Sequence, residues 1–247
     1  MKIATWNVNG IRARGAQLCE WLERDRPDVV CLQELKATPE QVPDACKALD
    51  YHVYWHGARA YSGVSLHVNK ALAEGAPAFT HPEFDMETRI VQVALGNLVL
   101  ASVYVPNGGK DYAAKLDFLN RLAVWTKQLH DEGRELVLCG DINIARADVD
   151  VHPRERKPGI IGQRPEEREL FAQMLGDHLV DVGRALDPDN ERLFTWWAPW
   201  RNMRSRNIGW RIDYVLASKT IAARAKSCVV LAGVGTSDHA PVMMTIE

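Results

Sequence analysis

The segment 135–143 constrains the fold of this 247-residue sequence more than any other stretch. Positions 136–139 are Leu, Val, Leu and Cys, a short apolar run of the kind that forms a buried strand. The run ends at Gly140, and Asp141 and Asn143 follow two positions apart. Because side chains at i and i+2 of an extended backbone point to the same side, we expect both polar groups to stand together at one edge of a sheet. An isolated motif of this type more often marks a simple turn. Whether it belongs to a functional site therefore depends on the residues that end the other strands.

Polar clusters also adjoin three other apolar runs of the chain. They are Asn7 with Asn9 after the first run, Glu34 after the second, and Ser237-Asp238-His239 before the last. Together they supply oxygen ligands without cysteine, a donor set that suits magnesium or manganese better than zinc. A histidine beside an aspartate adds a group that can donate a proton near neutral pH. Such a set is typical of enzymes in which a divalent cation assists the attack of water on a phosphate ester.

Composition limits the possible partners and compartments. The sequence has 30 Lys+Arg and 32 Asp+Glu, so attraction to nucleic acid would have to come from a local basic patch. The five cysteines are widely spaced and form no CxxC pair, which indicates a reducing compartment without disulfides or a zinc site. The sequence enters a strand-like run at once and has no apolar run of roughly 18 residues. We therefore expect a cytoplasmic protein with no membrane partner.

Periodicity predicts a mixture of strands and helices along the whole chain. Helices are expected ending before Pro27, over 39–49, around 116–129 and from 165; strands are expected over 2–6, 28–32, 51–56, 63–68, 89–95, 98–105, 135–139, 212–217, 227–231 and 242–246. Two segments, 145–164 and 194–211, look irregular. Hairpins beside strand–helix alternation favour an α+β fold with two sheets packed face to face and helices outside. We expect one domain over residues 1–247.

Six short motifs in this order resemble the exonuclease III family of apurinic/apyrimidinic (AP) endonucleases, within the endonuclease/exonuclease/phosphatase superfamily. They are Trp6-Asn7-Val8-Asn9-Gly10-Ile11-Arg12, Leu32-Gln33-Glu34, Tyr104-Val105-Pro106-Asn107, Gly140-Asp141-Ile142-Asn143, Trp210-Arg211-Ile212-Asp213 and Ser237-Asp238-His239-Ala240-Pro241. The resemblance extends from residue 2 to 246, and the run 204–211 is the part most specific to the DNA-repair branch. It implies a four-layer α/β-sandwich of two packed mixed β-sheets flanked by helices.

The resemblance also implies a role for each matched polar residue. Glu34 would be the principal ligand of Mg²⁺, for which Mn²⁺ can substitute, with Asn7, Asn9 and Asp238 around the cation. Asp141 would activate the attacking water and Asn143 would orient the water or the phosphate. His239, held by Asp213, would bind the phosphoryl oxygen, and Tyr104 and Asn107 would lie against the phosphate. Several relatives carry aspartate at the position of Asn9. Two bland alternatives stay open: Tyr104 as a packed strand aromatic, and Asp213 as a buried carboxylate satisfied by backbone donors.

The segment 194–211 contains four of the eight tryptophans together with four arginines. Arginines interleaved with aromatic residues suit a surface that holds phosphates and inserts apolar groups into a duplex, although a hydrophobic flap with a solvated basic edge would have the same composition. By resemblance, Trp196, Trp210 and Ile212 would line a pocket for a flipped-out baseless sugar. The residues expected to touch or wedge the DNA are Trp200, Arg201 and Arg204, with Lys110 after the Tyr104 strand as a further basic position.

The sequence is compatible with three functions. The first is a magnesium-dependent phosphodiesterase that cuts double-stranded DNA 5′ to abasic sites, also cleans blocked 3′ ends or acts as a 3′→5′ exonuclease, and works as a cytoplasmic, nucleoid-associated monomer. The second keeps the same core but acts on another phosphate ester, such as RNA, an inositol phosphate or a sphingolipid. The third is a non-catalytic regulator that binds nucleic acid. The arginine-rich run disfavours the second, and the complete set of acid, base and metal positions disfavours the third.

Overall fold

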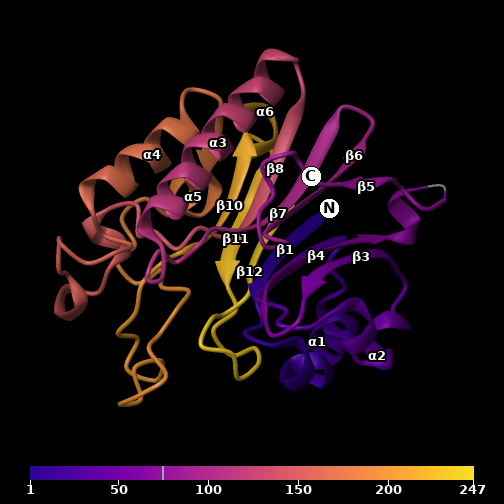
Figure 1. The fold of residues 1–247 in the computed structure, drawn as a ribbon, viewed down its shortest axis with the longest axis horizontal. Helices are drawn as coiled ribbons and strands as arrows, with labels where there is room; N and C mark the ends of the chain where they lie inside the picture. The colour runs from indigo at the N-terminus through magenta and orange to yellow at the C-terminus, as the bar shows by residue number, and fades with distance from the viewer. Residues whose placement is uncertain (74) are drawn as a thin grey trace.

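The chain folds into two six-stranded β-sheets that pack face to face, with helices against their outer faces (Figure 1). The coordinates are a computed structural model that describes residues 1–73 and 75–247. Each sheet contains one parallel pair, β1 with β2 in the first and β7 with β8 in the second, and its other pairs are antiparallel. The predicted α+β sandwich of two mixed sheets flanked by helices is therefore confirmed.

The strands of each sheet come from distant parts of the chain. The first sheet has the order β11 (Ala225–Val230), β12 (Val242–Ile246), β1 (Lys2–Asn7), β2 (Val29–Gln33), β4 (Tyr61–Asn69) and β3 (Tyr51–Ala58). The second has the order β5 (Phe79–Thr80), β6 (Ile90–Leu95), β7 (Leu98–Tyr104), β8 (Glu135–Asp141), β10 (Asp213–Ser218) and β9 (Leu179–Asp181). Both termini of the chain lie in or beside the first sheet. The N-terminus and the C-terminus are therefore close together in Figure 1.

Helices cover the two outer faces. The α-helices are α1 (Ile11–Asp25), α2 (Asp44–Lys47), α3 (Tyr112–Asp131), α4 (Pro165–Leu175), α5 (Val182–Leu186) and α6 (Lys219–Ala222). The 3-10 turns are η1 (Pro39–Gln41), η2 (Lys70–Leu72), η3 (Asp148–Asp150) and η4 (Pro153–Glu155). The apolar face of α1 packs on the first sheet, whereas α3 and α4 pack on the second. Each fully buried large apolar side chain in these layers contributes about 1.5–3 kcal/mol relative to an exposed one.

The single helix predicted over 39–49 is wrong. The structure has the 3-10 turn η1, a break at Val42 and Pro43, and then the one-turn helix α2. Pro43 has no backbone N–H to donate, and its ring disfavours helical dihedrals at Val42, which is extended with ψ 133°. The strands β5 and β9 went unpredicted because two and three residues are too short to show a period.

The sheet topology brings the polar strand ends to one place. Strands β1 and β2 run parallel, so Asn7 ends one and Glu34 follows the other at the same edge. Strands β7 and β8 are also parallel and end at Tyr104 and Asp141. Strand β10 runs antiparallel to β8 with Asp213 opposite Asp141, so it begins where β8 ends. Because the two sheets are packed together, all these ends open onto a common site.

Candidate active site

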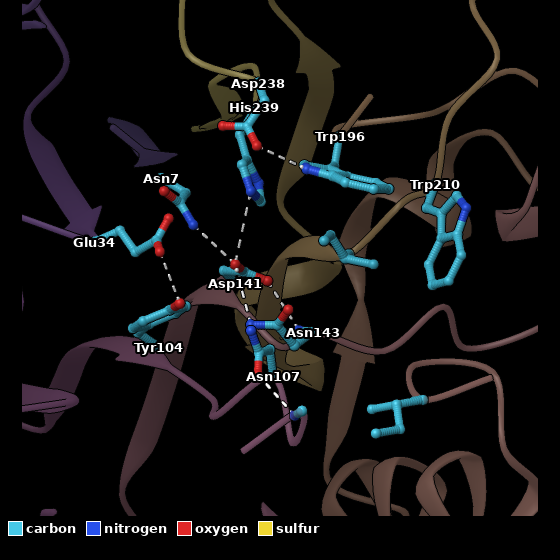
Figure 2. Close-up of a pocket in the computed structure, with 13 residues that line it drawn as sticks. Asn7, Glu34, Tyr104, Asn107, Asp141, Asn143, Trp196, Trp210, Asp238 and His239 are labelled. Atoms are coloured by element: carbon cyan, nitrogen blue, oxygen red, sulfur yellow. Dashed lines mark hydrogen bonds and ion pairs between the residues drawn. The ribbon is translucent and has the colours of Figure 1, made fainter. Parts of the chain in front are cut away.

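A cavity of about 340 Å³ lies where the strand ends converge (Figure 2). Its lining contains most of the residues that the sequence singled out. These are Asn7, Glu34, Tyr104, Asn107, Asp141, Asn143, Trp196, Trp210, Ile212, Asp238 and His239, joined by Gly109 and Ile161. Residues more than 200 positions apart in the sequence thus share one cavity.

Asp141 lies at the centre of this cavity and is buried, with 1% of its surface exposed. Its Oδ2 accepts a hydrogen bond from Asn7 Nδ2 at 2.9 Å, and its Oδ1 accepts one from the backbone N–H of Asn143 at 2.9 Å. Burial, followed by the nearby charge of Asp213, raises the pKa of Asp141 to about 7, although His239 and these hydrogen bonds act in the opposite direction. A carboxylate with a pKa near neutrality is well matched to the work of a general base.

Asp141 and Asn143 meet as predicted, but not through an extended backbone. Asn143 has φ 55°, in the left-handed region, and its N–H and side chain turn back toward Asp141. Asn9 has φ 44° and donates its N–H to Asn7 Oδ1 at 3.0 Å in the same way. Asparagine tolerates left-handed dihedrals better than most residues, and aspartate and asparagine side chains readily accept from the backbone two residues on.

Gly140 allows β8 to approach β7 closely just before the turn from Asp141 to Asn143. A Cβ atom at this position would lie 1.9 Å from the carbonyl oxygen of Val103. Any other residue would therefore push the two strands apart and displace Asp141. The glycine of the Gly-Asp-x-Asn motif thus has a packing role.

His239 is clamped in the cavity by Asp213. Its Nδ1 lies 2.9 Å and 3.1 Å from the two carboxylate oxygens of Asp213, and Thr195 Oγ1 donates to Oδ2 of the same carboxylate at 2.6 Å. The other ring nitrogen, Nε2, lies 4.0 Å from Asp141 Oδ2. Burial alone would lower the pKa of His239, but the charge and hydrogen bond of Asp213 outweigh it and raise the pKa to about 10. The ring is therefore an imidazolium at neutral pH, with its Nε2–H available to an anionic ligand.

Glu34 occupies the opposite wall of the cavity in a strained backbone conformation. Its φ is 56°, which is uncommon for a residue that is not glycine. The neighbouring backbone enforces this conformation, because Leu35 N–H donates to Gly63 O at 3.0 Å and Gly10 N–H donates to Glu34 O at 2.8 Å. Glu34 Oε1 accepts a hydrogen bond from Tyr104 OH at 3.0 Å. Burial and the charge of Glu34 raise the pKa of Tyr104, so its hydroxyl stays protonated and acts as a donor.

Asn9 lies just outside the lining and joins Glu34 to Asp238 indirectly. Its Nδ2 donates to Asp238 Oδ1 at 2.8 Å, and its Oδ1 accepts from Lys36 Nζ at 2.6 Å. Lys36 Nζ also lies 3.3 Å from Glu34 Oε1. The amide of Asn9 is therefore engaged at both ends, and the metal-ligand role that the sequence suggested for it stays a prediction.

The donor set on this side of the cavity fits a hard divalent cation. Glu34 and Asp238 offer carboxylate oxygens and Asn7 offers an amide oxygen, which are the ligand types that Mg²⁺ and Mn²⁺ prefer. Burial raises the pKa of Asp238, but His239 and the hydrogen bonds from Asn9 and Trp196 outweigh it, so that the pKa is lowered and the carboxylate stays ionised. Atoms of Asp141, Asp213 and His239 also lie within 4.8 Å of one another, but a cationic His239 ring donates through both nitrogens and has no lone pair for a metal ion.

Two tryptophans and an isoleucine form the apolar side of the cavity. The rings of Trp196 and Trp210 meet edge to face with their centroids 5.7 Å apart. Trp196 Nε1 donates to Asp238 Oδ2 at 3.0 Å, so this wall is tied directly to the polar side (Figure 2). Ile212 is buried beside them. The result is an apolar recess that opens next to Asp141 and His239.

The remaining predicted DNA-contacting residues do not line the cavity. Arg201 and Arg204 line a neighbouring hollow that shares Asp238 with it, and Lys110 lines another that shares Asn107. Trp200 is 59% exposed, and Arg201 and Lys110 are exposed as well. Arg204 differs, because its guanidinium donates to the backbone carbonyls of Ala232 and Val234 and so holds the loop that precedes Asp238. Contact between Arg204 and DNA stays a prediction. In the structure Arg204 stabilises the conformation of this loop.

Several residues of the site were missed from the sequence. Thr195, which bonds Asp213, and Ile161, which lines the cavity, lie in the two segments that lack a period. Lys36 could have been found, since it stands two positions after Glu34. Lys115 could also have been found, because it precedes Leu119 and Leu122 on the apolar face of α3 by four and seven positions.

Comparison with known proteins agrees with this geometry. Residues 4–239 match the Endonuclease/Exonuclease/phosphatase family. An exodeoxyribonuclease of Bacillus subtilis (strain 168) is 32% identical over 256 residues, covering 100% of both chains. Among solved structures, an AP endonuclease from Archaeoglobus fulgidus aligns with a TM-score of 0.90 at 27% identity, covering 100% of this chain and 99% of the other. A 3′ phosphatase from Neisseria bound to product DNA hairpin aligns with a TM-score of 0.87 at 31% identity, with coverage of 100% and 99%.

The chain therefore belongs to the endonuclease/exonuclease/phosphatase family. Its relatives at about 30% identity over the full length are exonuclease III-type nucleases and AP endonucleases, so it is a nuclease of that type. Members of this family depend on a metal, which agrees with the oxygen-rich cavity. None of the helices in the described ranges combines the length and the apolar character that a membrane span requires.

Proposed function

We propose that this protein hydrolyses the DNA backbone on the 5′ side of abasic sites with Mg²⁺ or Mn²⁺ bound. One observation carries the proposal: the apolar recess of Trp196, Trp210 and Ile212 adjoins the pair formed by Asp141 and His239. A cavity of about 340 Å³ can accept a sugar without a base. Turning a nucleotide out of the duplex costs least where no base is stacked, so such a recess selects abasic positions.

The polar residues are arranged for in-line attack of water on the phosphate. Asp141 takes a proton from the water while the oxygen forms its bond to phosphorus, and Asn143 orients the reactants. The bond from phosphorus to the 3′ oxygen breaks, and the leaving oxygen takes a proton from solvent water to become a 3′-hydroxyl, while Asp141 later returns its proton to solvent. His239 donates its Nε2–H to a phosphoryl oxygen and stabilises the charge that develops there, while Asp213 keeps the ring cationic.

The cation would be held by Glu34, Asn7, Asn9 and Asp238. When bound, it would neutralise negative charge on the phosphate and stabilise the transition state. The hydroxyl of Tyr104 orients the Glu34 carboxylate and faces the phosphate position with Asn107.

Double-stranded DNA would contact the rim of the cavity. Trp200 projects from the segment 199–207, where an exposed aromatic can enter a groove, and Arg201 and Lys110 can neutralise phosphates. The related 3′ phosphatase from Neisseria was solved bound to a DNA product, which supports DNA as the partner. We further propose that the chain acts as one catalytic domain and as a monomer, on DNA of the cytoplasmic nucleoid.

A second candidate function is 3′-end processing as the main activity, by 3′→5′ exonuclease or 3′-phosphatase cleavage. Similarity to the exodeoxyribonuclease of Bacillus subtilis and to the 3′ phosphatase from Neisseria favours this function. A 3′-terminal nucleotide or phosphate could enter the same cavity, because a chain end requires no flipping.

A panel of matched substrates separates these possibilities. Duplexes with one internal abasic site, with a recessed 3′ end, with a 3′-phosphate and with no lesion are compared under Mg²⁺, alongside an RNA of the same sequence. We expect the highest kcat/KM at the abasic duplex. Faster cleavage of either 3′ substrate would give the second candidate precedence, and cleavage of RNA alone would reject both.

A further inference from the structure

A fully buried ion pair joins the helical layer to the catalytic loops. Lys115 on α3 and Glu167 on α4 are both 0% exposed, and Lys115 Nζ lies 2.5 Å from Glu167 Oε1. A buried ion pair is a poor stabilising device, since an apolar pair of similar volume is often equally stable. Its presence beside a catalytic cavity therefore requires another explanation.

The ammonium group of Lys115 binds the backbone carbonyls of two asparagines whose side chains line the cavity. It donates to the carbonyl oxygen of Asn143 at 2.9 Å and to that of Asn107 at 3.4 Å. The first of these carbonyls belongs to a residue in the left-handed region, with φ 55°. Lys115 thus fixes the peptide that follows Asn143, whose N–H and side chain bind Asp141.

Glu167 extends the same arrangement to a third loop. Its Oε2 accepts from the backbone N–H of Gly162 at 2.7 Å and of Arg164 at 3.1 Å. Gly162 is packed between the turn at Asn143 and the recess, because a Cβ there would lie 2.9 Å from the ring of Trp210 and 3.2 Å from Asn143 O. Its neighbour Ile161 lines the cavity.

The loop that carries Asn107 is shaped to admit the lysine. Gly108 has φ 83°, and a Cβ at this position would lie 2.9 Å from Lys115 Cδ. The stem of Lys115 therefore occupies space that a side chain would otherwise fill. Burial lowers the pKa of Lys115 and the charge of Glu167 opposes this effect, which makes the pair interdependent.

We propose that Lys115 and Glu167 are positioning residues that set the relative places of three cavity loops, 106–109, 142–145 and 160–164. This inference rests on the proposed function, because it assigns the pair to the catalytic step through Asn143 and Asn107. The pair touches no substrate. We expect loss of the pair to lower kcat, because the loops it holds carry the residues that orient water and phosphate. KM should change little, because the exposed residues proposed to contact DNA lie elsewhere.

A double substitution separates positioning from stability. Lys115→Met alone leaves a buried unpaired carboxylate, so it should lower the melting temperature by roughly 5–15 °C. Lys115→Met combined with Glu167→Gln removes both charges, and the melting temperature should return to within about 3 °C of the wild type. The kcat on the abasic duplex should nevertheless stay at least roughly tenfold low, with KM within about twofold, because the carbonyls of Asn143 and Asn107 have lost their donor.

An exposed pair on the same helix provides the matched control. Lys127 and Asp131 of α3 are also 2.5 Å apart, with side chains 66% and 57% exposed. Lys127→Met combined with Asp131→Asn should leave both melting temperature and kcat unchanged. If the buried double variant regained wild-type kcat together with its stability, the pair would be merely structural and the proposal would be overturned.

A spectroscopic readout makes the test independent of the reaction. The side-chain amide of Asn143, assigned by comparison with Asn143→Ala, should shift or broaden in the 15N spectrum of the buried double variant and stay fixed in the exposed one. An unchanged Asn143 amide in the buried double variant would also overturn the proposal. If the wild type cleaved none of the duplexes, the proposed function would fail, and the spectrum would still decide whether the pair positions Asn143.

Discussion

Asp213 and His239 form a buried pair in which a carboxylate oxygen lies 2.9 Å from the ring nitrogen Nδ1. This contact fixes the ring orientation and leaves Nε2 facing the cavity, 4.0 Å from Asp141 Oδ2. We infer that the two aspartates have opposite roles on either side of one imidazole. The charge of Asp213 raises the pKa of His239 and favours the cationic ring, whereas the raised pKa of Asp141 suits this carboxylate to accept a proton.

Asp213→Asn tests the first of these roles. The amide keeps the shape of the side chain but removes the charge that raises the pKa of His239, so the ring should become neutral near pH 7. We expect kcat on the abasic duplex to fall by ~10²–10³-fold, comparable to the loss of one preorganised donor at a transition state. The 15N shifts of His239 should change from imidazolium to neutral imidazole. A ring that stays cationic in the variant would show that Asp213 is not the source of its charge.

Asp141→Asn should abolish cleavage and leave DNA affinity largely intact, because the amide cannot accept the proton of water. The same substitution should stabilise the metal-free protein. The pKa of Asp141 is raised from 3.8 to about 7, so the folded state binds its proton more tightly than the unfolded state. The stability that this proton provides is present at low pH and is lost as pH rises from about 4 through 7.

Denaturant unfolding in EDTA measures this second effect. At pH 8 the variant should exceed the wild type in unfolding free energy by about 2–4 kcal/mol, and the difference should close as pH falls toward 4. Asp189→Asn, a change at an exposed carboxylate, is the matched control and should give no difference at either pH. A variant that is less stable than the wild type at pH 8 would contradict the assigned environment of Asp141.

Trp210→Ala should separate abasic-site cleavage from exonuclease activity. Removing the ring opens the recess between Trp196 and Gly162, and the baseless sugar loses its apolar contact. We expect kcat/KM at the abasic duplex to fall by roughly 10–100-fold, equivalent to about 1.4–2.7 kcal/mol, with 3′→5′ degradation changed less than about threefold. Trp200→Ala, at an exposed position on the rim, should instead weaken both activities to a similar extent. Equal losses for Trp210→Ala would argue against the recess as the sugar site.

Glu34→Gln should raise the concentration of Mg²⁺ needed for half-maximal activity by at least about tenfold, because a neutral amide replaces the charged ligand. Adding EDTA should stop the wild type, and added Mg²⁺ or Mn²⁺ should restore it. Glu40→Gln, at an exposed glutamate in η1, provides the control and should leave the metal requirement unchanged. A Glu34→Gln variant with an unaltered metal requirement would place the cation elsewhere.

The general plan of the sheets follows from the sequence, because buried strands such as 136–139 are continuous apolar runs and the apolar face of α3 has a clear helical period. The polar clusters at the strand ends were also recognised, and they do share a cavity. The local geometry was not predictable from those patterns. Asn143 meets Asp141 through a left-handed turn that alternation cannot show, and Pro43 divides a segment whose composition resembles one helix.

Tertiary contacts account for the rest of what the sequence did not show. Thr195 reaches Asp213 only because an irregular segment folds back along β10, and no local signal marks that path. Lys115 stands on an apolar helix face, where a charge is unexpected, but its purpose depends on Glu167 and on two distant loops. The roles of Asn9 and Arg204 likewise depend on partners brought by the fold, Lys36 and the loop 232–237.

The most direct test of the account is the mapping of the ends produced from a duplex with one internal abasic site. The duplex, labelled on each strand in turn, is incubated with the protein and Mg²⁺ or with EDTA, and the products are identified by mass spectrometry. We expect a single magnesium-dependent cut that leaves a 3′-hydroxyl on the upstream fragment and a baseless sugar phosphate at the 5′ end of the downstream fragment. A cut on the 3′ side of the site, or equal cleavage in EDTA, would contradict the proposed function.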